Sequence, residues 1–536
     1  MAALPELGRP EVEKKNASGI TQTIFSRRSP ELFIALNGPM GSGVSEVGRV
    51  LEGLLVKDYA YKAKIYKVSQ LIAPLCAELG ETPPNEALAG TERVEELQNA
   101  GNKLREKFGN DVLARAIVRQ IARDREQSGF SGPPAKPLRM ARIIDGLKHP
   151  DELKFLFSIY GKSFWLVGVF ASEEFRTKRL KKKWSAPLEV VQEKDSHQEL
   201  AHGQKVRDLF ALSSYFIRND SYLPKDLEAP TSRFLSVLLR QDHSGPSSAE
   251  VGMAAAALAG RRSACLSRQV GAAVYSEQGE LLGVGWNDVP KFGGGLYASD
   301  SETDNRCYQW GGDGRVACHN DAEKHALRLE IFEKLKKKEL LVPQSSLQDL
   351  SEALKETSLR DLLEFSRSVH AEMEALLSLA RRGLAGVVGG TLYTTTFPCH
   401  NCARHIVASG VRTVYYIEPY PKSKATKLHS DSIVWNQGDD SRDHVCFLQF
   451  EGFAPRVFSA LFGDDEKKKH ELTGVPIASL PKEALPRLQP QIDSFIHYEQ
   501  MVVQDFMSLG QNSAPLEQST ADSEETDEKS TPDTAS

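Results

Sequence analysis

Apolar runs and amphipathic stretches alternate along the chain from about residue 31 to residue 243. The run at 32–36 leads into a glycine-rich segment at 38–43, after which apolar residues recur at helical spacing. Further apolar runs at 63–68, 141–144 and 164–170 are typical of strands, with helical stretches between them. This alternation predicts an α/β domain with a mostly parallel sheet and helices on both faces.

A second series of elements begins near residue 244. It predicts a helix around 254–258, strands at 270–275 and 281–286, and then a long polar insertion at 291–368. The 324–354 part of the insertion has helical character with Lys-rich faces, which are typical of solvated surface. From residue 369 the order becomes helix, glycine, strand, Pro-Cys turn, helix and strand. A second large α/β domain is therefore expected over 244–465.

The terminal segments have weaker patterns. Residues 1–30 are polar and mixed in charge, and they predict a flexible leader before the domain at 31–243. Residues 466–510 are expected to form a C-terminal extension. Residues 511–536 are rich in Ser, Thr, Asp, Glu and Pro and cannot bury a core, which predicts a disordered acidic tail.

Composition narrows the class of protein. The 536 residues include seven cysteines, an odd and sparse set that argues against a secreted disulfide framework. The formal net charge of −5 argues against a protein that coats a DNA duplex. Because neither a signal peptide nor a spanning apolar run is visible, we expect a cytoplasmic protein without membrane segments.

Four residues carry the strongest chemical signal. His370 and Glu372 lie near the start of a predicted helix, and Cys399 and Cys402 follow a strand as Pro-Cys-x-x-Cys. Two thiolates at a helix N-terminus and one imidazole make three protein ligands for zinc (Zn²⁺), which leaves a fourth position for water. Glu372, two residues beyond the ligand, would reach that water and act as a general acid and base.

The alternative is a closed structural zinc site with an exposed Glu372. His400 and His405 are then candidate fourth ligands, although they fall in the turn and on the following helix. A structural site usually has a second Cys-x-x-Cys or a His pair, and the sequence shows neither here. The spacing therefore favours the catalytic arrangement.

These residues resemble the zinc-dependent cytidine and deoxycytidylate deaminase superfamily, with its His-x-Glu and Pro-Cys-x-x-Cys signature. The resemblance covers about 245–463 and implies an α/β/α domain and a homo-oligomer. The Gly-Trp-Asn loop at Asn287 is more similar to the deoxycytidylate branch, which implies that Asn287 contacts the sugar or phosphate. Arg268 is a candidate phosphate partner or a structural tie, and Lys422 and Lys424 are either phosphate contacts or solvated loop.

The glycine-rich segment has the spacing of a Walker A loop with one departure. Its candidate nucleotide-binding residues are Gly38, Gly41, Ser42, Gly43, Val44, Ser45 and, after a later strand, Asp145. Val44 stands where the loop lysine belongs, so the group that neutralises β/γ-phosphate charge is missing. The loop favours a nucleotide-sensing or degenerate kinase-like domain, with Mg²⁺ at Ser45, over an active kinase; a purely structural loop is the third alternative.

Other residues in the chain have two interpretations. Arg176, Arg179 and Arg207 fall where nucleotide kinases carry lid arginines, or they lie on charged surface helices. Cys307, Cys318 and His319 lie in the insertion, where some deoxycytidylate deaminases bind a second zinc; unliganded, reduced cysteines are the favoured alternative. Cys76, Cys265 and Cys446 are expected to pack as small apolar residues.

The combination of the two domains resembles bacterial anti-phage dCTP and dCMP deaminases over about 30–463. The resemblance implies deamination of deoxycytidine nucleotides, depletion of the dCTP pool during infection, and an enzyme held inactive beforehand, with an inhibitory RNA or protein as a candidate partner. Two rival hypotheses are a deaminase acting on a flipped cytosine in RNA or single-stranded DNA, and a nucleotide-gated regulatory protein with structural zinc.

Overall fold

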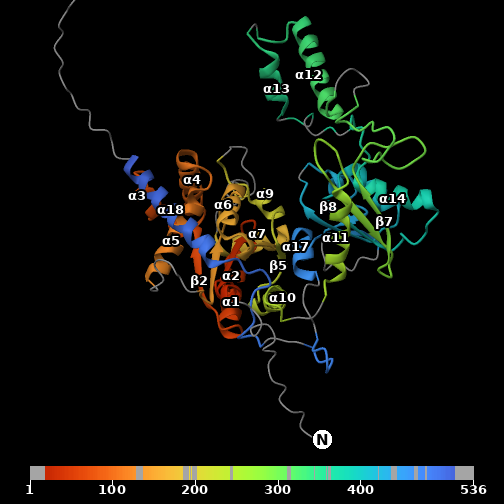
Figure 1. Cartoon of the computed structure of the whole chain (residues 1–536). Coiled ribbons are helices and arrows are strands. Elements are labelled where there is room, and N and C mark those ends of the chain that lie inside the picture. Colours follow the sequence, from red (N-terminus) through yellow and green to blue (C-terminus); the bar gives the residue numbers. More distant parts are fainter. Residues whose placement is uncertain are drawn as a thin grey trace, which may run out of the picture.

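The computed structural model describes residues 19–127, 137–184, 192, 195, 202–241, 245–310, 316–342, 344–355, 357, 359, 362, 364–420, 422–435, 443–463, 469–476 and 480–512. These residues form two six-stranded sheets that lie side by side, each covered by helices (Figure 1). The predicted α/β class is confirmed for both halves of the chain. The leader before residue 19 and the tail after residue 512 lie outside the described residues.

The N-terminal sheet has the strand order β12-β5-β4-β1-β3-β2. Five strands are parallel: β1 (Leu32–Asn37), β2 (Lys62–Lys67), β3 (Met140–Asp145), β4 (Phe164–Phe170) and β5 (Tyr215–Arg218). The four strands predicted from apolar runs are confirmed. The sequence analysis did not predict β5, which is four residues long and contains only three apolar residues.

Helices cover both faces of this sheet. They are α2 (Val44–Lys57), α3 (Val68–Glu78), α4 (Gly90–Phe108), α5 (Val112–Gln127), α6 (Pro150–Tyr160), α7 (Glu173–Lys183), α9 (Val206–Ala211) and α10 (Glu228–Leu238). Because side chains alternate along a strand, Phe33 packs with α3 to α6 whereas Ile34 packs with α2 and α10. Both residues are fully buried, as expected for a parallel sheet between two helix layers.

The C-terminal sheet has the order β10-β11-β9-β8-β6-β7. Its strands are β6 (Gly271–Tyr275), β7 (Leu281–Trp286), β8 (Thr391–Thr396), β9 (Thr413–Glu418), β10 (Ile433–Val434) and β11 (Val445–Gln449). Helix α11 (Ser248–Gly260) packs on one face around Ala273, while α14 (Ala371–Arg382) and α15 (His400–Ala408) pack on the other around Leu392. This is the α/β/α arrangement that the sequence resemblance implies.

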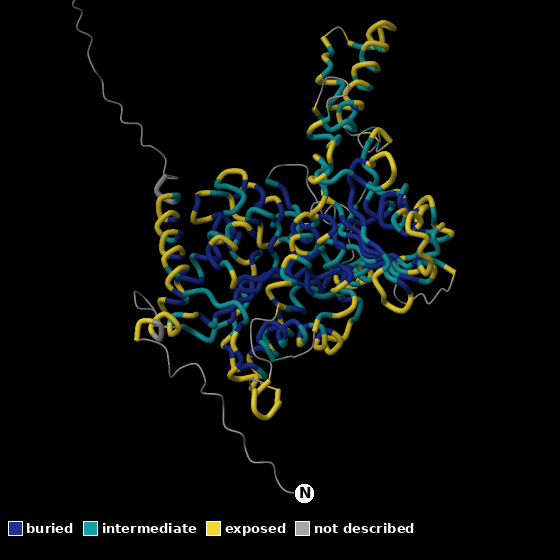
Figure 2. The backbone as a smooth tube through the Cα atoms, turned by 45° about the vertical axis from the view of Figure 1, so that its right-hand side comes forward, coloured by how far each residue is buried: buried dark blue, intermediate teal, exposed yellow. Residues whose placement is uncertain are grey.

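The polar insertion projects from the body of the C-terminal unit (Figures 1 and 2). It contains two helices, α12 (His319–Lys337) and α13 (Leu347–Lys355), where the sequence analysis expected helical character over 324–354. The chain turns after α12 at residues 338–339, and most residues of the two helices are exposed or half-buried.

The C-terminal part of the chain returns to the N-terminal unit, which differs from the predicted boundary at 465. Strand β12 (Gly452–Phe453) pairs antiparallel with β5, α17 (Pro455–Phe462) packs Leu461 into the same core as β1 and β5, and α18 (Ile492–Asn512) lies along α5. Helix α18 contributes Phe495 and Phe506 to the core beneath α3 to α6. Apolar spacing in the sequence predicts a helix or a strand but not the sheet against which it packs. The predicted boundary at 465 followed sequence order, and it therefore assigned β12 and α17 to the wrong unit.

The expected leader also differs from the structure in its last third. Residues 19–26 form helix α1 (Gly19–Ser26), and the Arg27 guanidinium forms an ion pair with Asp493 of α18. The Ser29 N–H donates to the carbonyl oxygen of Pro490 at 2.9 Å. Residues 19–30 are therefore held against the C-terminal extension. Among the described residues, no helix is both long enough and apolar enough to cross a membrane.

Candidate metal centre and active-site cavity

Helix α14 brings His370 and Glu372 into the interior. His370 is the N-cap, and the preceding Val369 N–H donates to the Asp288 carbonyl beyond β7, which fixes the start of the helix. Ala371 and Ala375 are fully buried against the sheet because small side chains allow α14 to approach it closely. The helix ends at Gly383 in the left-handed conformation, as predicted.

The cysteines come from the strand–turn–helix that follows. Cys399 is the N-cap of α15, where its Sγ accepts the N–H of Cys402 at 3.4 Å. Hydrogen bonds from Cys402 and from His370 lower the pKa of the Cys399 thiol to about 4 despite its burial. A thiolate at a helix N-terminus is the protonation state that a metal requires.

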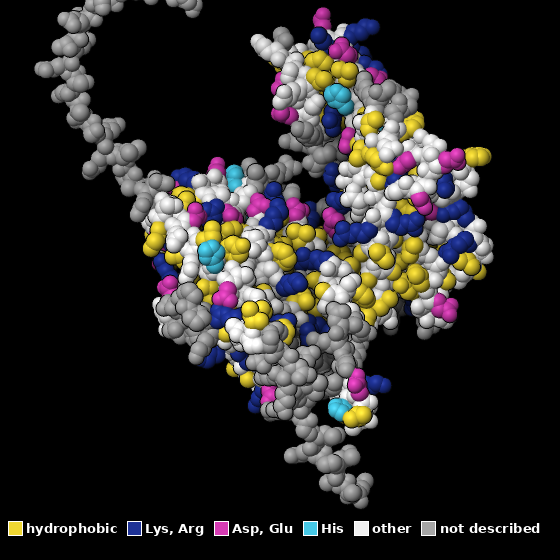
Figure 3. All heavy atoms as spheres, viewed as in Figure 1, with side chains coloured by type: hydrophobic (Ala, Val, Ile, Leu, Met, Phe, Trp, Pro, Cys, Tyr) yellow, Lys and Arg dark blue, Asp and Glu magenta, His cyan; other side chains and the backbone are white. Residues whose placement is uncertain are grey.

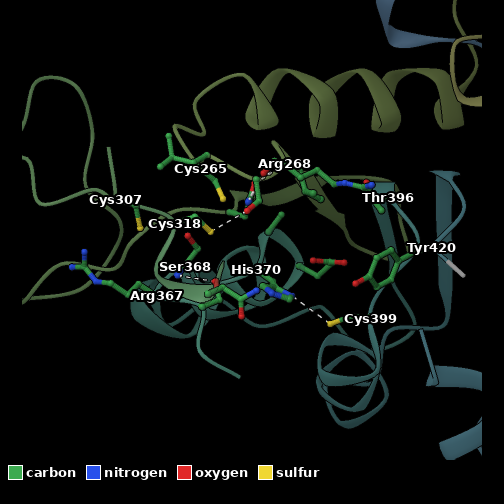
Figure 4. A pocket seen from close by; sticks show the side chains of 18 of the residues that line it. Cys265, Arg268, Cys307, Cys318, Arg367, Ser368, His370, Thr396, Cys399 and Tyr420 are labelled. Carbon is green, nitrogen blue, oxygen red and sulfur yellow. Dashed lines mark hydrogen bonds between the residues drawn. The ribbon is translucent and has the colours of Figure 1, made fainter. Parts of the chain in front are cut away.

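The three predicted ligands converge on one point (Figure 4). His370 Nδ1 lies 3.2 Å from Cys402 Sγ and 3.4 Å from Cys399 Sγ. Zinc bonds of about 2.0 Å to nitrogen and about 2.3 Å to sulfur, at a tetrahedral angle, separate such atoms by about 3.5 Å. The residues therefore fit a zinc ion with three protein ligands.

The candidate fourth ligands do not join this group. Within the part of the chain that the structure describes, the cluster of ligand atoms within 4.8 Å of one another consists of His370, Cys399 and Cys402. His405 instead places Nδ1 2.7 Å from the carbonyl oxygen of Asn401 on its own helix. An open fourth position is the arrangement of catalytic zinc sites.

Glu372 lies against the ligand cluster and is only 4% exposed. Its Oε2 lies 3.5 Å from Cys402 Sγ. Burial raises the pKa of this carboxyl group, and the neighbouring His370 opposes the shift. A carboxyl group whose proton affinity is raised, beside an open metal position, has the placement that proton transfer requires.

A cavity of about 290 Å³ opens above the zinc ligands. Glu372, His370 and Cys399 form its floor. Its walls come from 265–268, Val270 and Asn287, from Cys307 and 318–320, from 366–368, and from Thr396, Phe397, Tyr420 and Lys422, several of which Figure 4 labels. Its described lining contains three Lys or Arg side chains, Arg268, Arg367 and Lys422, and Glu372 as its one carboxylate. The walls therefore favour a small, negatively charged ligand.

The structure places both predicted substrate residues at this cavity. Asn287 accepts the N–H of Val270 through Oδ1 and donates to the carbonyl oxygen of Arg268 through Nδ2, each at 2.7 Å. Arg268 forms an ion pair with Glu418 at 3.1 Å, and its guanidinium lies 5.9 Å from the ring centre of Tyr420. Asn287 therefore holds the loop that presents Arg268. Lys422 lines the cavity, whereas Lys424 is not among its lining residues.

Sequence reasoning missed Arg367 and the aromatic wall. Arg367 lies 3.7 Å from the ring centre of Trp310, and its Nη1 is buried without a hydrogen-bond partner among the described residues. Phe397 and Tyr420 complete the wall on the other side. Arg367 stands three residues before His370, and this short separation is the feature of the sequence that could have identified it as a cavity residue.

Cys307, Cys318 and His319 line the opposite end of the same cavity, where Cys265 joins them (Figure 4). Cys318 Sγ lies 3.3 Å from Ser267 Oγ. In the described residues, these side chains do not form a second cluster at ligand distance. The expectation that Cys265 packs as a small apolar residue is wrong in part, because it lines a cavity wall.

The glycine loop of the N-terminal unit joins β1 to α2. Gly41 and Gly43 have φ angles of 85° and 83°, and a Cβ at Gly43 would lie 2.1 Å from Asn219 Nδ2. Ser45 Oγ donates to Asp145 Oδ2 at 2.6 Å, so the two predicted Mg²⁺-site residues are adjacent. A hydroxyl and a carboxylate in contact suit a magnesium ion with a bound phosphate.

The loop is also braced by groups from its own unit. The Met40 N–H donates to Asp195 Oδ2 at 2.7 Å, and Lys148 Nζ lies 2.6 Å from the other oxygen of that carboxylate. Arg179 donates to the Gly41 carbonyl at 2.6 Å. Of the candidate lid arginines, Arg179 is therefore used to hold the loop, whereas Arg176 and Arg207 line a second cavity.

The C-terminal unit is similar to a known protein family. Residues 246–418 match the model described as "Cytidine and deoxycytidylate deaminase zinc-binding region". A deoxycytidylate deaminase of Enterobacteria phage T2 is 43% identical over 56 residues, 10% of this chain and 29% of that protein. The chain thus spans less than a third of that relative. Residues 246–418 are therefore similar to the zinc-binding region of this family.

The solved structures that are similar to parts of this chain are more distant. The dCMP deaminase from cyanophage S-TIM5, in complex with dCMP and dUMP, is 21% identical, with a TM-score of 0.22 over 39% of this chain and all of that one. The shikimate kinase from Acinetobacter baumannii, in complex with shikimate, is 18% identical, with a TM-score of 0.21 over 40% of this chain and 96% of that one.

Proposed function

We propose that this protein is a zinc-dependent hydrolase that deaminates deoxycytidine nucleotides to deoxyuridine nucleotides. One observation carries the proposal: a buried carboxyl group, Glu372, lies beside a three-ligand zinc site at the floor of a small cavity with cationic walls. The family match over residues 246–418 supports the same chemistry. Both dCMP and dCTP are proposed substrates.

The residues divide the reaction between them. Zinc, when bound by His370, Cys399 and Cys402, lowers the pKa of water and makes it a nucleophile at neutral pH. Glu372 would take the first proton of the attacking water and deliver it to N3 of the cytosine ring; it would then carry the second proton, released from the new C4 hydroxyl as the carbonyl forms, to the amino group, which leaves as ammonia. Burial of Glu372 supports this role because the group must hold and release a proton in turn.

The cationic walls support a phosphorylated substrate. Arg268, Arg367 and Lys422 would bind phosphate oxygens, and Asn287 would hold the loop against the deoxyribose. The size of the cavity, about 290 Å³, supports a mononucleotide over a polymer. We also propose a cytoplasmic location, which agrees with a free-nucleotide substrate.

The resemblance of the two-domain sequence to anti-phage deaminases supports a role in defence against phage. We propose that the enzyme lowers the dCTP pool during phage infection, that it acts as a homo-oligomer, and that an inhibitory RNA or protein holds it off beforehand. The N-terminal unit is proposed to bind a nucleotide with Mg²⁺ at Ser45 and Asp145. The adjacency of those two side chains supports that assignment.

Glu372→Gln tests the mechanism. We expect at least a thousandfold loss of ammonia release from dCMP and dCTP, because an amide cannot transfer the proton. Zinc content, measured on the same sample by mass spectrometry, should remain at the wild-type level. Glu374→Gln, on the same helix and paired with Arg381, is the control and should retain activity within about threefold. Full turnover in Glu372→Gln would refute the mechanism.

A substrate panel tests the rivals. The wild-type protein is incubated with dCMP, dCTP, a cytosine-containing single-stranded DNA and an RNA, and products are identified by mass spectrometry. We expect uracil only in the free nucleotides. Conversion of the polymers alone would establish polynucleotide deamination, and no conversion with zinc bound would favour the regulatory hypothesis.

A further inference from the structure

The glycine loop between β1 and α2 has no cation of its own. Val44, at the position of the loop lysine, packs its side chain against the core of the N-terminal unit. No described side chain caps helix α2, and the first N–H groups of a helix have no partner within it. Such a loop attracts an anion through its N–H groups, but a positive charge must come from elsewhere in the chain.

Lys148 brings a positive charge to the loop from the neighbouring strand. It lies three residues after the end of β3, and the Gly146 and Leu147 N–H groups both donate to the Leu36 carbonyl of β1 at 3.2 Å. These bonds hold the segment beside the strand that leads into the loop. The carboxyl ends of two neighbouring parallel strands therefore bring a lysine and the glycine loop together.

Asp195 lies between the loop and Lys148. One of its oxygens accepts the Met40 N–H at 2.7 Å, and the other lies 2.6 Å from Lys148 Nζ. The residue is 1% exposed. A carboxylate removed from water to this degree is stable because the N–H and the ammonium group replace its hydration. The loop therefore binds an oxyanion in this structure, and that oxyanion belongs to the chain itself.

One polar group inside the loop is not satisfied by this arrangement. Ser42 is fully buried, and its Oγ forms no hydrogen bond with any residue that the structure describes. A Cβ placed on Gly38 would lie 2.6 Å from that oxygen, so the hydroxyl lies within the curve of the loop. A buried hydroxyl without a partner is costly. A ligand with more oxygens than a carboxylate, such as a phosphate, would satisfy it.

Arg176 of α7 is a second cation beside Asp195. Its carbonyl oxygen would lie 3.0 Å from a Cβ placed on Gly41, which puts its backbone against the loop. Burial lowers the pKa of Arg176, while the carboxylates of Glu173 and Asp195 act in the opposite direction. Glu173 is exposed, so water screens its charge. Displacement of Asp195 removes a negative neighbour from both Lys148 and Arg176, which favours another anion in its place.

Two further carboxylates adjoin the loop, and both are engaged. Asp145 accepts the Ser45 hydroxyl, at the position proposed for Mg²⁺. Glu46 Oε2 and Arg179 Nη1 both lie within 3.4 Å of a Cβ placed on Gly43, so a cation accompanies that carboxylate. On the outer surface over α7 and α9, Lys and Arg side chains are mixed with Asp and Glu (Figure 3). A preference for phosphate therefore depends on the groups inside the loop.

We propose that Asp195 occupies the position of a nucleotide phosphate, and that the phosphate displaces it and binds the Met40 N–H and Lys148 instead. Lys148 then supplies the charge that a loop lysine provides. Because the tethered carboxylate competes with the ligand, the loop binds a nucleotide more weakly than the same groups without Asp195. This inference rests on the proposed nucleotide binding by the N-terminal unit and does not depend on the deaminase function.

Calorimetric titration of the full-length protein with ATP and Mg²⁺ tests the displacement; ATP is the probe because it has no cytosine. Asp195→Asn keeps the shape of the side chain and an oxygen for the Met40 N–H but removes the charge. We expect it to lower the dissociation constant for ATP at least fivefold and to leave that for adenosine, which has no phosphate, unchanged. Asp505→Asn, an exposed aspartate of α18 that pairs with Arg115, is the matched control and should bind ATP as the wild-type protein does.

Lys148→Ala tests the substitute for the loop lysine. It should raise the dissociation constant for ATP at least fivefold, whereas Lys154→Ala, an exposed lysine of α6, should leave it unchanged. Because the two anions compete for Lys148, Asp195→Asn should tighten ATP binding less than twofold in the Lys148→Ala protein. Thermal unfolding without ligand checks that each variant folds. Asp195→Ser, with a smaller uncharged side chain, repeats the first test and should also tighten binding.

Each result separates the displacement from the nucleotide site itself. ATP binding that Asp195→Asn leaves unchanged or weakens would overturn the displacement and make Asp195 a permanent brace or a ligand of Mg²⁺, while the nucleotide site would stand. Equal tightening with and without Lys148 would overturn the role of that lysine. If ATP binds neither the wild-type protein nor Asp195→Asn, the proposed nucleotide site fails, and the displacement fails with it. Ammonia release from dCMP, measured on the same samples, tests the deaminase function separately.

Discussion

At the scale of single residues, burial changes the protonation and solvation of the charged side chains in the candidate active site. Removing a carboxyl group from water without a strong partner favours its neutral form. Glu372 has this environment, and the same wall of the fold buries part of Arg367 against Trp310. Glu372 can carry a proton, and Arg367 is a partly desolvated cation at the opposite end of the small cavity. This arrangement suits a substrate that has both a reactive ring and an anionic group.

Arg367→Ala tests which end of the substrate this cation binds. We expect KM for dCMP to rise at least tenfold, because a charge-assisted hydrogen bond is worth about 1.5–3 kcal/mol. The value of kcat should change less than twofold, and turnover of deoxycytidine, which lacks the phosphate, should be unaffected. Arg404→Ala, an exposed arginine on α15, is the control. An equal loss with dCMP and deoxycytidine would show that Arg367 supports the fold instead.

The metal ligands could be predicted because their spacing is local, whereas the cavity walls could not. His370, Glu372, Cys399 and Cys402 occupy two helix starts whose sequence context is itself informative. Cys265 and Arg367 reach the same cavity from separate segments, and no periodicity in the sequence places those segments together. The position of an arginine three residues before a ligand does not reveal what it contacts.

At the scale of elements, the C-terminal helix α18 completes a core that begins about 460 residues earlier, at Phe33. Phe495 packs its ring 5.7 Å from Phe33 of β1, measured between ring centres, and 5.9 Å from Tyr160. Glu499 and Glu31 both bind the buried Arg125, at 2.9 and 2.8 Å. Apolar residues at 492, 495, 502 and 506 have helical spacing, so the helix was predictable; its packing partner was not, because long-range pairing leaves no local pattern.

Phe495→Ala should therefore destabilise the N-terminal unit although it lies near the end of the chain. We expect the free energy of unfolding to fall by about 3–5 kcal/mol, because the substitution leaves a cavity in a packed core. Urea titration followed by circular dichroism measures the change. Met507→Ala, 67% exposed on the same helix, should shift stability by less than about 0.5 kcal/mol. Equal stability of the two variants would mean that α18 does not pack as the structure places it.

At the scale of the whole molecule, the chain crosses between its two units more than once. After β11 of the C-terminal sheet it adds β12 to the N-terminal sheet, and the Ala454 N–H donates to the Ser214 carbonyl at 2.9 Å. Glu250 of α11 joins the units through one carboxylate, which accepts the Phe453 N–H at 2.9 Å and pairs with Arg233 at 2.6 Å. This connection holds the two units together.

Glu250→Ala tests whether the units act as one body. Glu250 is 1% exposed, so its loss leaves a buried N–H and an arginine unpaired and should cost about 3 kcal/mol. Because the zinc ligands lie in a separate core cluster, zinc content should remain unchanged, while thermal unfolding should separate into two transitions. Glu277→Ala, an exposed carboxylate after β6, controls for loss of charge. A single transition at the wild-type temperature would show that other contacts suffice to join the units.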